Sequence, residues 1–222
     1  MPEPRGWHSR GYLPHYDDGR SIQTITYRLA DSLPAHVLAQ LEEQTLDDDK
    51  RRAAIEHYLD AGHGSCILRE PTNAQIVLDT WRHFDGVEYQ LHAWVVMPNH
   101  VHVLVEPDAR YAIGDIIGAW KSVSARRILS GGATAPGRIP VGATDATEGG
   151  RAPNRSSKKR HLWQIDYYDR FIRNERHYRA AVDYIHQNPV NAGLVVRADD
   201  WPWSSAANWV ERRNATIGGP IS

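Results

Sequence analysis

The spacing of apolar residues divides this chain into segments with a period of two and segments with a helical period. Residues 21–29 alternate along the chain and are rich in β-branched side chains, which favours a strand. Residues 89–96 and 100–106 repeat this period on either side of Met97-Pro98-Asn99, which predicts an antiparallel hairpin. Apolar residues three and four apart predict five helices: one that opens at Pro34, and residues 48–60, 71–84, 113–129 and 174–188.

Strands and helices do not alternate regularly along the chain, so the predicted fold class is α+β with an antiparallel sheet. Residues 130–160 are rich in glycine and proline and contain few large apolar residues, which predicts a mobile insertion. We therefore expect one domain, residues 21–210, interrupted by that insertion. An amino-terminal arm (residues 1–20) and a flexible tail (residues 211–222) would flank it. Thr72 is the expected N-cap of the helix of residues 71–84, and Pro189 and Gly193 are expected to end the helix of residues 174–188.

Composition excludes several classes of protein. The 222 residues, 41% of them hydrophobic, can bury a core, and a net charge of −1 predicts neither a nucleic-acid nor a membrane partner. A single cysteine, Cys66, excludes a disulfide framework and a thiolate-rich zinc site. The polar amino terminus has no apolar core of a secretion signal, and no apolar run reaches the length of a membrane span. The expected location is the cytoplasm.

Two histidines at the start of the second hairpin strand are the sharpest chemical feature. Because side chains alternate along a strand, His100 and His102 point to the same face, and their imidazoles could converge on one cation. Two hydrogen-bonded polar residues on a sheet face would produce the same tripeptide. The His-x-His pattern therefore needs a partner from elsewhere in the chain.

A tyrosine and an asparagine on the helix of residues 174–188 could supply that partner. Tyr184 and Asn188 are one turn apart beside the apolar stripe of this helix. If the helix crosses the histidine face, Asn188 could offer a carbonyl oxygen to the same cation and Tyr184 would lie over it. A phenol, with a pKa near 10, can still attack a phosphate that a metal ion polarises. A hydrogen-bonded aromatic at the edge of the core and a helix stop at Asn188-Pro189 are the alternative interpretations.

Three runs of residues together resemble the single-tyrosine HUH transposases, and in particular their REP-associated tyrosine transposase branch. The runs are residues 93–102 (AWVVMPNHVH), residues 163–164 and 169–173 (WQ and DRFIR), and residues 184–195 (YIHQNPVNAGLV). The resemblance extends over most of residues 22–203 outside the insertion. The amino-terminal segment and the insertion depart from the family pattern, so the resemblance does not extend to the choice of substrate.

The resemblance implies a fold, a site and a reaction. The fold would be a ferredoxin-like antiparallel sheet covered by helices, with the HUH motif on its central hairpin. His100 and His102 would bind a divalent metal with Asn188, and Tyr184 would be the nucleophile. Members cut single-stranded DNA near repetitive extragenic palindromes, hold it through a 5′-phosphotyrosine link and rejoin it without a nucleotide cofactor. Tyr167, Tyr168 and Tyr178 are rival nucleophiles, but no metal-capable residue matches them one turn on.

Magnesium or manganese is the expected metal. Two imidazoles and one amide oxygen leave coordination positions open for water or phosphate oxygens, which suits either cation. Zinc would also accept two histidine ligands.

Basic residues concentrate in the second half of the chain. Residues 151–179 contain nine lysines and arginines against three acids, a local balance of +6 that would neutralise DNA phosphates. Aromatic residues nearby could stack unpaired bases. The expected DNA-binding residues are Arg170, Arg173, Trp120, Lys121, Trp163, Lys158, Lys159 and Arg160. A solvated linker and ordinary core aromatics are the alternative interpretation of this region.

Two other functions would use the same motifs. A domesticated module could bind DNA or RNA hairpins without cutting them, because an intact motif does not prove turnover. A metal-dependent hydrolase could use an activated water, in which case Tyr184 would be dispensable. The sequence leaves a monomer and a homodimer equally open.

Overall fold

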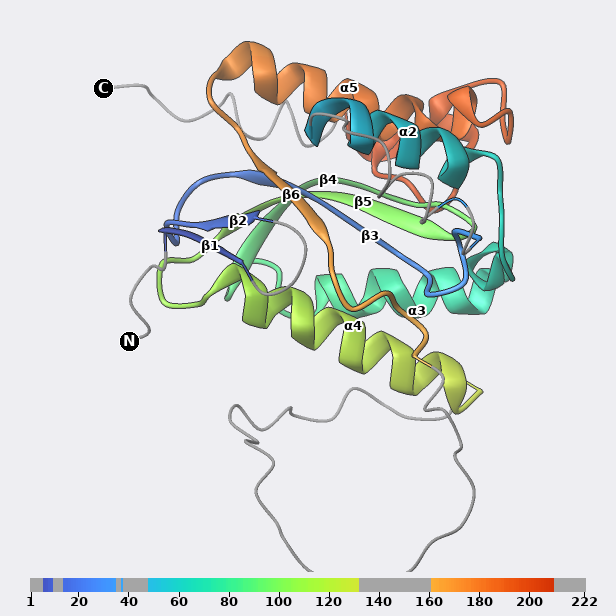
Figure 1. Ribbon diagram of the computed structural model, residues 1–222, viewed down its shortest axis with the longest axis horizontal. Helices are drawn as coiled ribbons and strands as arrows, with labels where there is room; N and C mark the ends of the chain where they lie inside the picture. Colours follow the sequence, from blue (N-terminus) through green and yellow to red (C-terminus); the bar gives the residue numbers. More distant parts are fainter. Residues whose placement is uncertain (1–5, 10–13, 35–36, 38–47, 132–160, 210–222) are drawn as a thin grey trace, which may run out of the picture.

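The computed structural model describes residues 6–9, 14–34, 37, 48–131 and 161–209 (Figure 1). Three expected segments lie largely outside the described residues. They are the helix that opens at Pro34, the insertion (residues 132–160) and the tail from residue 210. The helices and strands run as follows: β1 Gly6–Ser9, β2 Pro14–Asp17, β3 Gln23–Arg28, α2 Asp48–Asp60, η1 Ile67–Arg69, α3 Pro71–Arg82, β4 Tyr89–Val96, β5 His100–Pro107, α4 Ile113–Leu129, β6 Tyr168–Phe171, α5 Glu175–Asn191, η2 Ala198–Asp200 and η3 Ala206–Asn208.

A four-stranded antiparallel sheet in the order β4-β5-β3-β6 forms the centre of the molecule. α2 and α3 connect β3 to β4, and β5 lies between these two strands in the sheet. α4 connects β5 to β6. This is the ferredoxin-like topology, and the predicted α+β class is confirmed. α3 and α4 cover one face of the sheet, and α2 and α5 cover the other (Figure 1).

Strand register decides which side chains meet on each face. Thr26 of β3 is paired with His102 of β5 on one side and with Tyr168 of β6 on the other. Directly paired residues project to the same face, so these three side chains share the face that α2 and α5 cover. Val101 and Val103 project to the opposite face and are fully buried.

The face under α3 and α4 holds most of the core, and its large aromatics are hydrogen-bonded. Trp81 Nε1 donates to the Tyr27 hydroxyl at 2.9 Å, and Trp120 Nε1 donates to the Tyr89 hydroxyl at 2.8 Å. Trp163 Nε1 donates to Ser124 Oγ at 2.9 Å. A buried indole needs such an acceptor. Trp81, Trp120 and Trp163 are therefore core residues.

Two helix boundaries differ from the sequence prediction. Glu70, not Thr72, is the N-cap of α3, because Pro71 takes the first helical position, where its missing N–H has no helical partner to lose. Pro189 lies inside α5, which continues to Asn191. Gly193, just beyond the C-cap Ala192, has a φ of 68° and terminates the helix, and the Leu194 amide donates back to the Pro189 carbonyl at 2.9 Å. Asn188 is therefore helical and lies one turn after Tyr184.

The amino-terminal segment folds as a hairpin of β1 and β2 that packs on β6. His15 of this hairpin is fully buried between two carboxylates: its Nδ1 lies 2.6 Å from Asp169 and its Nε2 lies 3.0 Å from Asp166. The ring stacks on Tyr167, with centroids 4.2 Å apart. Burial by itself would lower the pKa of His15, but the two carboxylates outweigh it and raise the pKa to about 9. An imidazolium ion therefore fixes the hairpin to β6.

Stability should depend on pH through His15. Because its pKa is higher in the folded chain than in the unfolded one, the stabilisation is complete below about pH 6.5 and is lost as pH rises through about 9. His15→Gln removes the charge but keeps a polar side chain. We expect the unfolding free energy of the unaltered protein to exceed that of His15→Gln by about 2–3 kcal/mol at pH 6 and by much less at pH 10. Urea unfolding at both pH values measures this, and an equal difference at both would contradict it.

Candidate active site

The two histidines lie next to each other at the start of β5. His100 and His102 are each only 1% exposed, and their ring centroids are 4.8 Å apart. The Met97-Pro98-Asn99 turn places them there, and the Met97 amide closes it on the His100 carbonyl at 2.9 Å. Two adjacent imidazoles on one sheet face match the sequence expectation.

Asn99 determines which nitrogen of His100 carries the proton. Its Nδ2 donates to the carbonyls of Leu59 and His63, both at 3.0 Å, so its Oδ1 is the atom that faces His100 Nδ1 at 2.8 Å. The Nδ1 atom must then donate, and Nε2 keeps its lone pair. This buried Nε2 has no hydrogen-bond partner among the described residues. Burial, with the neighbouring His102, holds the pKa of His100 well below its usual value, so the ring is neutral.

His102 is held from both sides. Its Nδ1 lies 2.7 Å from the hydroxyl of Thr26, the residue paired with it on β3. Its Nε2 lies 3.4 Å from Asn188 Nδ2 on α5. If that amide donates, His102 Nε2 also keeps its lone pair, and Nδ1 donates to Thr26. Both imidazoles then present the same nitrogen for coordination.

α5 brings the tyrosine and the asparagine to this histidine pair. The Tyr184 ring meets His102 edge to face, with centroids 5.2 Å apart, and the Tyr184 hydroxyl lies 3.4 Å from Asn188 Nδ2. Asn188 is 1% exposed, and its Oδ1 has no hydrogen-bond partner among the described residues. The structure therefore brings together all four residues that the sequence assigned to the site.

Asp60, at the end of α2, lies beside this group and was not identified from the sequence. Its Oδ1 is 3.9 Å from His100 Nε2 and has no hydrogen-bond partner in the described part of the chain. Burial raises the pKa of Asp60 to about 6, against the opposing effect of His57. Only the docking of α2 reveals this proximity, because the two residues are 40 positions apart and no spacing rule connects them.

The polar atoms of the site fit a divalent cation. His100 Nε2, Asn188 Oδ1 and Asp60 Oδ1 are buried without hydrogen-bond partners among the described residues, an arrangement that is rare unless another group satisfies them. No three His, Cys, Asp or Glu side chains in that part of the chain converge closely enough to hold a metal alone. A cation here would need the Asn188 amide and oxygen atoms from water or substrate.

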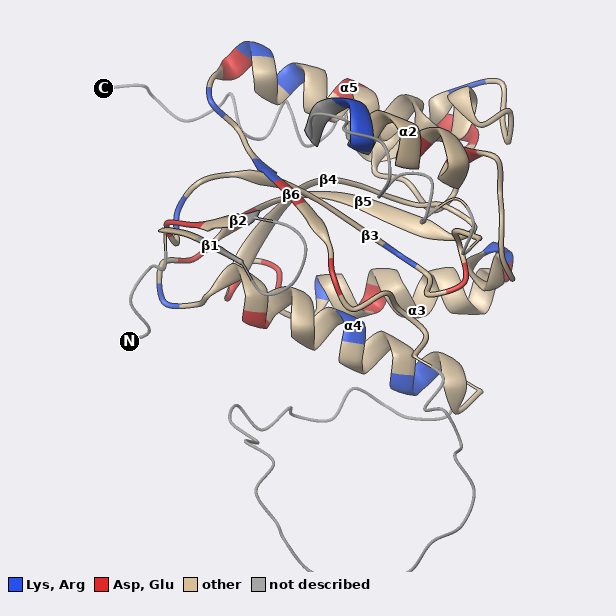
Figure 2. Cartoon of the chain, viewed as in Figure 1, with Lys and Arg blue, Asp and Glu red and all other residues tan. Residues whose placement is uncertain are grey.

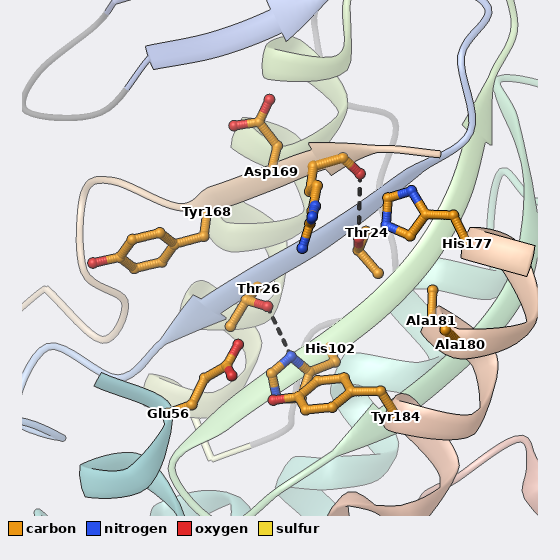
Figure 3. Close-up of a pocket in the computed structure, with 11 residues that line it drawn as sticks. Thr24, Thr26, Glu56, His102, Tyr168, Asp169, His177, Ala180, Ala181 and Tyr184 are labelled. Carbon is orange, nitrogen blue, oxygen red and sulfur yellow. Dashed lines mark hydrogen bonds between the residues drawn. The ribbon is translucent and has the colours of Figure 1, made fainter. Parts of the chain in front are cut away.

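A pocket of about 230 Å³ opens beside Tyr184 on the same face of the sheet. Figure 3 shows polar side chains from β3, α2 and β6 pointing into it from one side and α5 closing the other. The lining residues are Thr24, Thr26, Glu56, His102, Tyr168, Asp169, Arg170, His177, Ala180, Ala181 and Tyr184. Tyr184 thus lines an open cavity and is only partly buried.

Two of the expected DNA-binding residues belong to β6 or to the segment that follows it. Arg170 lines the pocket, and Arg173 follows β6 with its guanidinium 5.3 Å from the centre of the Phe171 ring. Figure 2 shows basic residues on α2, on β6 and at the N-terminal part of α5, with acidic residues among them, and these three elements contribute residues to the pocket. Of these charged residues, Arg170 lines the pocket together with the acids Glu56 and Asp169.

Three other expected DNA-binding residues lie elsewhere. Trp120 and Trp163 are 2% and 4% exposed in the core beneath the opposite face, so neither has a ring face free for a base. Lys121 donates to three backbone carbonyls, those of residues 164, 165 and 166, at 2.9–3.1 Å, and its burial lowers its pKa to about 8. We interpret these three as structural residues. Lys158, Lys159 and Arg160 lie outside the described residues.

The rival tyrosines lie in different surroundings. Tyr167 stacks on His15, and the Tyr178 hydroxyl lies 3.0 Å from His92 Nδ1. Tyr168 lines the pocket, and burial raises its pKa. Tyr184 is the tyrosine that contacts both His102 and Asn188.

The described helices are all too short or too polar to cross a membrane.

Comparison with known proteins gives one consistent result. The family model described as "Transposase IS200 like" matches residues 79–136, a segment that contains the histidine pair but ends before Tyr184. The REP-associated tyrosine transposase of Escherichia coli K12 is 28% identical over 120 residues, 53% of this chain and 54% of that protein. A relative from Haemophilus influenzae, described in similar words, is 27% identical over 120 residues, 53% of this chain and 58% of its own length. The chain thus spans about half the length of the curated relatives it matches.

A solved structure extends the comparison to the whole fold. It is described as a REP-associated tyrosine transposase bound to a REP hairpin, and it superposes with a TM-score of 0.51 at 19% identity. The match covers 96% of this chain and 94% of that one, and it shows a common fold. The resemblance that the three sequence runs predicted is therefore confirmed: the chain is similar to the REP-associated tyrosine transposases.

Proposed function

We propose that this protein cleaves and rejoins single-stranded DNA through a covalent 5′-phosphotyrosine intermediate on Tyr184. The observation that carries the proposal is the position of Tyr184, which lines an open pocket and whose hydroxyl lies 3.4 Å from an asparagine that also contacts the buried histidine pair. Phosphoryl transfer needs an aligned nucleophile next to groups that stabilise phosphate charge.

In the proposed cleavage step, one phosphorus–oxygen bond forms as another breaks. The Tyr184 oxygen attacks the phosphorus of a DNA phosphodiester, an O–P bond forms, and the bond from phosphorus to the 3′ oxygen breaks. The phenol proton passes to solvent, and the departing 3′ oxygen takes one up. The 5′ phosphate stays on the tyrosine. Rejoining is the reverse reaction with another 3′ hydroxyl, so the bond energy is conserved and no nucleotide cofactor is needed.

His100, His102 and Asn188 would hold Mg²⁺ or Mn²⁺ in this proposal. The bound cation would polarise the phosphate and neutralise charge as the bond to the 3′ oxygen breaks. Thr26 and Asn99 hold the two imidazoles in orientation, and the Asp60 carboxylate beside His100 adds negative charge that favours a cation. Arg170 would bind the phosphate backbone at the pocket.

The proposed substrate is single-stranded DNA at a palindrome that folds into a hairpin. Support comes from the solved structure, which is described as bound to a REP hairpin, and from the name of the E. coli relative. Such an enzyme would act in the cytoplasm, at the nucleoid. The described contacts favour neither a monomer nor a homodimer.

Replacing the nucleophile should abolish covalent attachment. We expect unaltered protein with Mn²⁺ and labelled hairpin DNA to give a protein-linked band on a denaturing gel, and Tyr184→Phe to give none, because it lacks the attacking oxygen. Tyr168→Phe is the matched control, since Tyr168 lines the same pocket, and it should keep the band. Cleavage by Tyr184→Phe without an adduct would indicate a hydrolase that uses water. Tight binding by the unaltered protein without cleavage would indicate a binding module.

Removing the support of His102 should weaken metal binding without changing the ligands. Thr26→Val keeps the shape of the side chain but loses the hydroxyl that lies 2.7 Å from His102 Nδ1. We expect Mn²⁺ affinity, measured by isothermal titration calorimetry, to fall roughly 10-fold or more.

Thr24→Val provides the control for this measurement. Thr24 lies two residues earlier and also lines the pocket, but its hydroxyl donates to the Arg170 carbonyl at 3.2 Å instead. Its Mn²⁺ affinity should stay unchanged. Equal affinities of Thr26→Val and the unaltered protein would show that His102 is not part of a metal site.

A further inference from the structure

The β1–β2 hairpin carries an exposed group of aromatic side chains that the proposed chemistry does not use. Trp7 is 64% exposed, and its ring centroid lies 5.2 Å from that of Tyr16 and 6.2 Å from that of Phe171. Tyr16 and Phe171 are themselves 4.9 Å apart. We call Trp7, Tyr16 and Phe171 the hairpin aromatic cluster. A large exposed indole supported by two rings is typical of a binding surface rather than of a core.

This cluster adjoins the pocket across a single strand. Phe171 directly follows Arg170, a pocket residue, on β6, which is an edge strand of the sheet. Successive side chains of a strand point to opposite faces, so the cluster and the pocket lie on the two sides of β6. Arg173 lies on the cluster side, because its guanidinium lies over the Phe171 ring.

Arginines near the cluster could pair with the phosphates of a polyanion. Asp169 and Asp166 lie beneath the hairpin, but both are hydrogen-bonded to His15, and the Asp169 side chain is only 2% exposed. Arg173 lies beside the cluster at Phe171, and Arg170 lines the pocket on the other face of β6. A strand with negative phosphates and flat bases matches this combination of arginines and aromatic faces.

Hydrogen bonds from β2 also anchor the described strands of the hairpin to β6. Besides the two carboxylate contacts of His15, the Tyr16 amide donates to Asp169 Oδ2 at 2.9 Å. Tyr16, the partner of Trp7 in both the strand pairing and the ring contact, is therefore anchored to β6 through its own backbone. A pre-positioned ring loses little entropy when a base stacks on it.

We propose that the hairpin aromatic cluster stacks an unpaired base of the DNA strand that enters the Tyr184 pocket, with Trp7 as the contacting ring. The strand would cross β6 between Arg170 and Arg173. This inference rests on the proposed function, because it concerns how the same DNA is held.

The test compares two DNA ligands by fluorescence anisotropy: a blunt hairpin, and the same hairpin with a single-stranded flank. Trp7→Ala should bind the flanked hairpin roughly ten-fold more weakly than the unaltered protein does, because stacking on one base is lost, while its affinity for the blunt hairpin stays the same. Trp7→Phe keeps an aromatic face and should retain most of the affinity. Val196→Ala, which alters another exposed apolar residue, is the control and should change neither.

Each result decides the inference separately from the catalytic proposal. Equal affinities of Trp7→Ala and the unaltered protein for the flanked hairpin would overturn the stacking role, even if the Tyr184 adduct forms. An equal loss for both ligands, or no rescue by Trp7→Phe, would also overturn it. A selective loss for the flanked hairpin in a protein that forms no adduct would support the stacking role while refuting the proposed cleavage. Absence of any DNA binding by the unaltered protein would overturn both.

Discussion

The packing of α5 against β4 and β5 is the constraint on which the whole site depends. Val182 and Ile185 of the helix are buried against Ala93, Val95 and Leu104 of the sheet. Each such side chain contributes on the order of 2 kcal/mol when it is fully buried. Because Tyr184 and Asn188 lie beside this stripe, the same contacts that stabilise the fold bring a phenol and an amide to the histidine pair.

The other essential feature is a group of polar atoms that the fold buries and leaves unsatisfied. A buried polar atom without a partner costs about 1–3 kcal/mol. His100 Nε2, Asn188 Oδ1 and Asp60 Oδ1 incur this cost together at one place. Sites where buried polar atoms lack hydrogen-bond partners are commonly functional. A neutral imidazole, with its proton fixed on the far nitrogen by Asn99, is ready to coordinate a cation without first losing a proton.

Much of this architecture could be predicted from local patterns. The period of two located the hairpin that carries His100 and His102, and the helical period located α4 at its observed bounds. The resemblance to known transposases identified Tyr184 and Asn188. These features are encoded within short segments, so each can be recognised without the rest of the fold.

The features that could not be predicted from the sequence depend on contacts between distant segments. Nothing local distinguishes Trp120, whose indole bonds to Tyr89 in the core, from Trp7, which is exposed on the hairpin. The contact of Asp60 with His100, and that of His15 with Asp169 across 154 positions, appear only when helices and strands are docked. Pro189 and Gly193 were expected to end the last long helix at Asn188, but α5 continues through Pro189 to Asn191 and stops just before the glycine.

The central claim, that Tyr184 carries the DNA, is tested most directly by mapping the attachment site. After reaction with hairpin DNA and Mn²⁺, the protein would be digested with nuclease and trypsin and analysed by mass spectrometry. Cleavage after Arg179 and Arg197 gives a peptide, residues 180–197, in which Tyr184 is the single tyrosine. The account predicts a nucleotide attached to this peptide through a 5′ phosphate. Attachment to the peptide that contains Tyr167 and Tyr168, or DNA cleavage with no modified peptide, would contradict it.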